Sequence, residues 1–231
     1  MKTYDDIIEG ITKPVSRAEI AKVVNSVKRS VVRKPLSIEQ IAKLLSNAIN
    51  KKWKTDVTIF AVSSRLDQGE LNLNGMYDWT SETIEIQLLH HPDDKVYHIE
   101  PSRWDKFADG LTNAIQHELL HHMQYVNRDY QQSKKFTRYT SDDIDIMGAQ
   151  EYLGNDDEIE AFGLNIANEL LSYFKDDKEK VLTALRHFRK LASNRDASIN
   201  LFAYMIAFGF NEKSPVIRKL VKKIVQYVQS S

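Results

Sequence analysis

The segment His117-Glu118-Leu119-Leu120-His121 constrains this chain more than any other. It matches the H-E-x-x-H pattern, in which two residues four apart on a helix share one face, so both imidazoles can reach one metal ion. The Glu lies about 100° around the helix, where its carboxylate can touch a metal-bound water without becoming a ligand. His is scarce, with 7 in 231 residues, and a chance match is roughly a one-in-a-hundred event. The segment predicts a helix with two zinc ligands, His117 and His121, and a general base, Glu118.

Composition limits the kinds of metal site and partner. The chain has 42% apolar and 28% charged residues, which is ordinary for a globular protein. It has no cysteine, so any metal must be held by histidine and carboxylate side chains. A formal net charge of zero gives nucleic-acid binding no electrostatic support. We find no signal peptide and no apolar stretch long enough for a membrane span, and therefore expect a cytoplasmic protein without a membrane partner. The oligomeric state is left open.

Apolar periodicity predicts a small sheet before the motif helix. Val57–Ser63 is a strand candidate, Asn74-Gly75 is typical of a turn, and Met76–Trp79 with Thr83–Leu88 suggests a hairpin or meander. The motif helix is expected to begin with Ser102 as its N-cap and to reach about residue 127. The edge strand of such a sheet can pair with an extended peptide through main-chain hydrogen bonds.

Helices are expected on both sides of this region. Ser16–Glu19 has the capping-box pattern, and Ser37 begins a second amphipathic helix. The polar segment Gln131–Ile146 is expected to be a long connection. The helices predicted after it cover 156–175, 178–193, 197–208 and 214–229.

A catalytic zinc needs a third protein ligand and an open position for water. Glu158 is the strongest candidate, because Ala161 lies three residues further on the same helix face and a small residue lets two backbones approach. Glu160 and Asp157 remain alternatives. Asn155-x-x-Glu158 is also a capping-box pattern, in which the carboxylate would bind the helix backbone instead.

The neighbours of the motif are assigned no chemistry. His122 directly follows His121, so it points about 100° away from the metal face and is expected at the surface or behind the ligands. Gln124 and Arg128 lie about one and two turns beyond His121, where they could fix the helix.

The combination of H-E-x-x-H with Tyr152 and Glu158 downstream resembles the gluzincin class of zinc metallopeptidases, in particular phage-encoded metallopeptidases and lethal-factor-type toxin peptidases. The resemblance covers roughly residues 76 to 172. It implies Glu158 as the third ligand and Tyr152 as a hydrogen-bond donor to the oxyanion. The thermolysin-like pattern has an Asp four residues after the ligand Glu, which orients a His. Phe162 stands there in this chain, so the orienting role is unassigned.

We therefore expect an α+β, zincin-like fold that is mostly helical, with a small mixed or antiparallel sheet before the H-E-x-x-H helix. Residues 1–55 would form an N-terminal helical segment, 56–175 the metallopeptidase core, and 176–231 a C-terminal helical segment packed on the core. The expected function is zinc-dependent hydrolysis of a peptide or protein substrate. The alternative is a catalytically silent zincin-fold binding or structural protein, with a virion-associated location as its setting.

Overall fold

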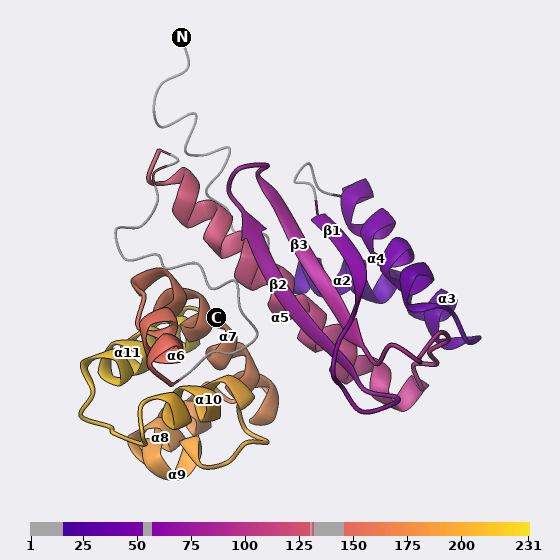
Figure 1. Ribbon diagram of the computed structural model, residues 1–231. Coiled ribbons are helices and arrows are strands. Elements are labelled where there is room, and N and C mark those ends of the chain that lie inside the picture. Colours follow the sequence, from indigo (N-terminus) through magenta and orange to yellow (C-terminus); the bar gives the residue numbers. More distant parts are fainter. Residues whose placement is uncertain (1–15, 53–56, 130, 132–145) are drawn as a thin grey trace. The chain divides into compact units, whose positions relative to one another are not determined.

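The computed structural model describes residues 16–52, 57–129, 131 and 146–231 (Figure 1). It divides into two compact units, Met1–Tyr130 and Gln131–Ser231, so the division falls inside the region 56–175 that the sequence groups as one core. The expected connection Gln131–Ile146 lies, apart from its two ends, outside the described residues. In the described part of the chain, no helix is both long and apolar enough to cross a membrane.

The first unit combines helices with a three-stranded sheet. Its elements are α2 (Arg17–Ser26), α3 (Lys28–Val32), α4 (Ile38–Lys52), β1 (Val57–Ser63), β2 (Leu71–Asp78), β3 (Thr83–His90) and α5 (Pro101–Val126). The strand order is β1-β3-β2, with β1 parallel and β2 antiparallel to β3. The expected small sheet before the motif helix is therefore confirmed, and of the two expected kinds it is the mixed one.

The sheet buries one face because its side chains alternate with a period of two. Ile84, Ile86 and Leu88 of β3 are fully buried, whereas the residues between them are partly exposed. Val57 and Ile59 of β1 pair with Ile84 and Ile86, so they lie on the same buried face. Helix α4 packs mainly on β1 and α5 on β2, which forms a layer of helices over this face (Figure 1).

The predicted turn at Asn74-Gly75 is wrong, since both residues lie inside β2. The hairpin turn comes later, at residues 79–82, where Asp78 accepts a hydrogen bond from the backbone N–H of Thr80 and Glu82 has a positive φ of 54°. Asn-Gly indicates a turn because both residues tolerate positive φ. Gly75 has no positive φ, so another property of glycine must explain its place in the strand.

The motif helix α5 begins two residues earlier than expected. Its N-cap is Glu100 rather than Ser102, and Pro101 takes the first helical position, where its fixed φ is already helical. Trp104, Leu111 and Ile115 are fully buried on the inner side of the helix.

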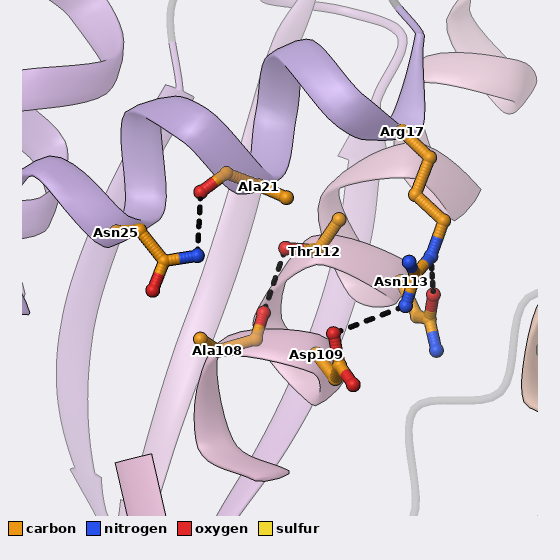
Figure 2. A network of polar contacts seen from close by, with 7 residues as sticks. All are labelled: Arg17, Ala21, Asn25, Ala108, Asp109, Thr112 and Asn113. Carbon is orange, nitrogen blue, oxygen red and sulfur yellow. Dashed lines mark hydrogen bonds and ion pairs between the residues drawn. The ribbon is translucent and has the colours of Figure 1, made fainter. Parts of the chain in front are cut away.

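Polar contacts attach α2 to the N-terminal half of α5 (Figure 2). The Arg17 guanidinium donates to Asp109 Oδ1 at 3.1 Å and to Asn113 Oδ1 at 3.3 Å. The Trp104 indole N–H donates to Asn25 Oδ1 at 2.7 Å, so its buried polar atom has a partner. The predicted capping box at Ser16 and Glu19, which starts α2, is confirmed. These contacts fix the first turns of α5, ahead of the motif.

The second unit is helical throughout its described part. Its elements are α6 (Ile146–Leu153), α7 (Asp156–Tyr173), α8 (Lys178–Arg186), α9 (Phe188–Ala192), α10 (Ile199–Ala207) and α11 (Pro215–Ser230). Helix α7 packs closely along α11, because a Cβ built at Gly163 would lie 2.8 Å from Cβ of Lys223. The four predicted helices are confirmed with one change. The second is broken at His187 into α8 and α9.

Candidate metal centre

Helix α5 places the two motif histidines on one face. Their Nε2 atoms lie 3.0 Å apart, and their ring centroids are 4.7 Å apart. His117 is buried and His121 is partly buried. The i, i+4 spacing therefore brings the two imidazoles together as the sequence predicts. Two nitrogen ligands of a tetrahedral zinc at 2.0–2.1 Å would be roughly 3.3 Å apart, so the observed spacing suits one shared ion.

Gln124 lies one turn beyond His121 and contacts its other ring nitrogen. The distance from His121 Nδ1 to Gln124 Oε1 is 2.8 Å. An amide oxygen can only accept, so this contact favours the tautomer in which Nδ1 carries the proton. The Nε2 lone pair is then available to a metal. The orienting role that the sequence leaves unassigned at Phe162 is thus filled by Gln124 on the motif helix itself. Its i, i+3 spacing from His121 was the available signal.

His122 belongs to a different contact, as its position after His121 predicts. Its Nδ1 lies 3.0 Å from the Tyr77 hydroxyl, and the two rings meet edge to face at 5.3 Å. Burial lowers the pKa of His122, and the charge of Glu82 opposes this more weakly. His122 therefore attaches α5 to β2 near the motif.

Glu118 is buried, with 5% of its surface exposed, and it lies against β2. A Cβ built at Gly75 would lie only 2.5 Å from Glu118 Oε1. The carboxylate thus fills the space in which any other residue at position 75 would carry a side chain.

In the second unit, Glu158 and Glu160 near the start of α7 have different surroundings. The Asn155 side chain caps the helix by accepting from the Asp157 backbone N–H at 2.9 Å. Glu160 accepts from Lys223 Nζ at 2.6 Å and from the Tyr227 hydroxyl at 2.8 Å. Both Glu160 oxygens thus have donors within their own unit. Glu158 is buried, with 3% exposed.

His117, His121 and Glu158 form a group that could hold a metal ion, since one ligand atom of each lies within 4.8 Å of the others. No second group of this kind occurs among the described residues. Two imidazoles and a carboxylate are a ligand set found in zinc sites, and three protein ligands leave a coordination position for water. These three residues could therefore bind a metal ion.

Aromatic side chains surround the start of α7. Tyr152 of α6 and Tyr204 of α10 both pack edge-on against Phe162, with ring centroids at 6.4 Å and 5.5 Å. The Tyr204 hydroxyl donates to the Leu153 carbonyl at 3.0 Å. Burial raises the pKa of Tyr204 well above its ordinary value, and the charge of Glu158 adds to the effect. The sequence offered no signal for Tyr204, and the oxyanion role of Tyr152 stays a prediction.

Comparisons with protein-family models, curated proteins and solved structures found no match for this chain.

Proposed function

We propose that this protein is a zinc-dependent peptidase with a zincin-like fold, and that it hydrolyses a peptide or protein substrate. The observation that carries the proposal is the group of His117, His121 and Glu158, with Glu118 beside the first histidine on the same helix. A purely structural zinc site is normally closed by four protein ligands. Three ligands with an adjacent buried carboxylate are typical of a hydrolytic site.

In this proposal, His117 and His121 bind zinc through Nε2, and Glu158 supplies the third ligand. Zinc bound there would polarise the scissile carbonyl and lower the pKa of water to about 7. Gln124 keeps the ring of His121 oriented and its Nε2 unprotonated.

Glu118 is the proposed general base. It accepts a proton from the attacking water and delivers it to the leaving amine, so that one carboxylate serves both halves of the reaction. The Tyr152 hydroxyl is the proposed donor to the oxyanion, a role that several side chains can fill in such sites.

The test is zinc content together with hydrolysis of casein or a peptide library. Purified protein should carry about one zinc per chain, because three good ligands retain the metal. Glu118→Gln keeps the size and the ligands, so it should retain zinc and lose hydrolysis by about 10²–10⁴-fold. His117→Ala should lose zinc and activity together.

Two results would contradict the proposal. Hydrolysis by Glu118→Gln at the wild-type rate would remove the general base. Zinc-loaded protein that cleaves nothing would favour the alternative, a catalytically silent metal-binding protein.

A further inference from the structure

Gly75 lies in the middle of β2, a position where glycine is normally unfavourable. A glycine inside a strand has no side chain to pack and loses more conformational freedom than other residues, so it often marks a close approach. Gly75 pairs with Ile86 of β3, on the sheet face that the helices cover. Without a positive φ, its backbone conformation is open to any residue. The reason for glycine must therefore be space.

The space next to Gly75 is filled by Glu118. A Cβ at position 75 would lie 2.5 Å from Oε1 of Glu118 and 3.0 Å from its Cγ and Cδ. Carbon atoms do not approach a carboxylate this closely without displacing it. Because Glu118 is 5% exposed, its carboxylate has little room to move aside.

The register of β2 on α5 explains why the two residues meet. Two residues along a strand span about 6.6 Å and four along a helix about 6 Å, so strand and helix can advance in step. Gly75 meets Glu118, and two residues further Tyr77 meets His122, four residues along the helix. On the other side, the Leu73 side chain reaches back to Gly110, eight residues before Glu118 on the helix, where a built Cβ would lie 3.3 Å from Leu73 Cδ1. Contacts of Leu73 and Tyr77 with α5 therefore lie on both sides of Gly75.

We infer that Gly75 is a positioning residue. Because it has no side chain, it leaves open the space that the Glu118 carboxylate occupies, and so it keeps that carboxylate oriented for proton transfer. This inference rests on the proposed function, in which Glu118 moves the proton. Gly75 has no side chain to offer a substrate or a metal, so the proposed effect acts through Glu118.

The first measurement is the stability of Gly75→Ala in two backgrounds, and it needs no enzymatic activity. In the wild-type background the added methyl group collides with Glu118, so the Tm should fall. In the Glu118→Ala background the colliding atoms are gone, and alanine is favoured over glycine in a strand, so the same change should raise the Tm or leave it unchanged. An equal Tm change in both backgrounds would overturn the inference.

The second measurement is kinetic. Gly75→Ala should keep its zinc and its KM but lose kcat by about 100-fold, the scale expected when a catalytic group is displaced by about 1 Å. In the Glu118→Asp background, where the shorter side chain leaves room for the methyl, Gly75→Ala should cost much less. Gly110→Ala is the matched control on the same interface, and it should leave kcat unchanged.

The outcomes separate the two proposals. A background-dependent Tm in a protein that hydrolyses nothing would support the contact and overturn the peptidase function. A wild-type kcat in Gly75→Ala would overturn the positioning role, even if the peptidase function holds.

Discussion

The two units surround their glutamate side chains in different ways. In the helical unit, Glu160 is held by Lys223 and Tyr227, and Glu169 is held by Ser198 and Asn200. In the unit that contains the sheet, the Glu118 side chain occupies the space that the glycine at position 75 leaves open. The first arrangement depends on hydrogen-bond donors in the same unit, whereas the second depends on the absence of a side chain on the neighbouring strand.

Within helix α7, neighbouring glutamates have different roles, one at the metal centre and one in the packing of the helices. Glu158 and Glu160 lie two residues apart on α7, yet only Glu158 belongs to the group that could hold a metal. Substitutions at the donor-held carboxylates should therefore change stability and leave metal binding intact. Substitutions at the metal centre should weaken metal binding and leave the stability of the metal-free protein largely unchanged.

The largest effect concerns the contact that orients His121. Gln124→Ala removes the acceptor at Nδ1, and loss of such a partner typically weakens metal binding by about 10–100-fold. Zinc affinity from competition with a chromophoric chelator is the measurement. Gln124→Glu retains an acceptor and serves as the control, with affinity near that of the wild type. If Gln124→Ala bound zinc as tightly as the wild type, the orienting role would be refuted.

A smaller effect is expected at Glu160. Glu160→Ala leaves the Tyr227 hydroxyl and the Lys223 ammonium without this acceptor, and because the pair is partly exposed to solvent it should lower the free energy of unfolding by about 1 kcal/mol. Urea denaturation measures this loss, and zinc content should stay at the wild-type level. Loss of zinc in a folded Glu160→Ala protein would show that the wrong glutamate was assigned to structure.

The smallest effect is the pH dependence from Glu169. Burial raises the pKa of this carboxyl, and the hydrogen bonds from Ser198 and Asn200 oppose the shift only in part. The folded state therefore binds the proton more tightly than the unfolded state does. Its contribution to stability is present below the unfolded pKa, near 4.5, and is lost as the pH rises through the folded pKa.

Glu169→Gln cannot titrate, so the variant should gain stability relative to the wild type as the pH rises above about 4.5. Thermal unfolding of both proteins between pH 4 and 8 gives the difference, and a pH-independent difference would contradict this assignment.

The sequence was most informative where one local pattern determines the structure. The i, i+4 histidines meet because helix geometry alone brings them together. Val57–Ser63 forms the predicted strand, and the capping box at Ser16 forms as expected. Each of these depends on residues within one element.

Features that depend on contacts between elements were missed. Asn74-Gly75 has the local signal of a turn, but the approach of Glu118 on α5 explains the glycine, and that contact joins residues 43 positions apart. Helix α6 was not predicted, although it carries Tyr152. Glu158 and Glu160 could not be separated, because the donors to Glu160 come from α11, more than 60 residues later.

X-ray absorption at the zinc edge of the purified, zinc-loaded protein is the most direct test of the metal centre. We expect two imidazole nitrogens at about 2.0–2.1 Å and a carboxylate oxygen, with a remaining position filled by water. The spectrum of Glu158→Gln should change in its oxygen shell and keep both imidazoles. A zinc coordination shell with no histidine, or with four protein ligands and no exchangeable water, would contradict the proposed metal centre.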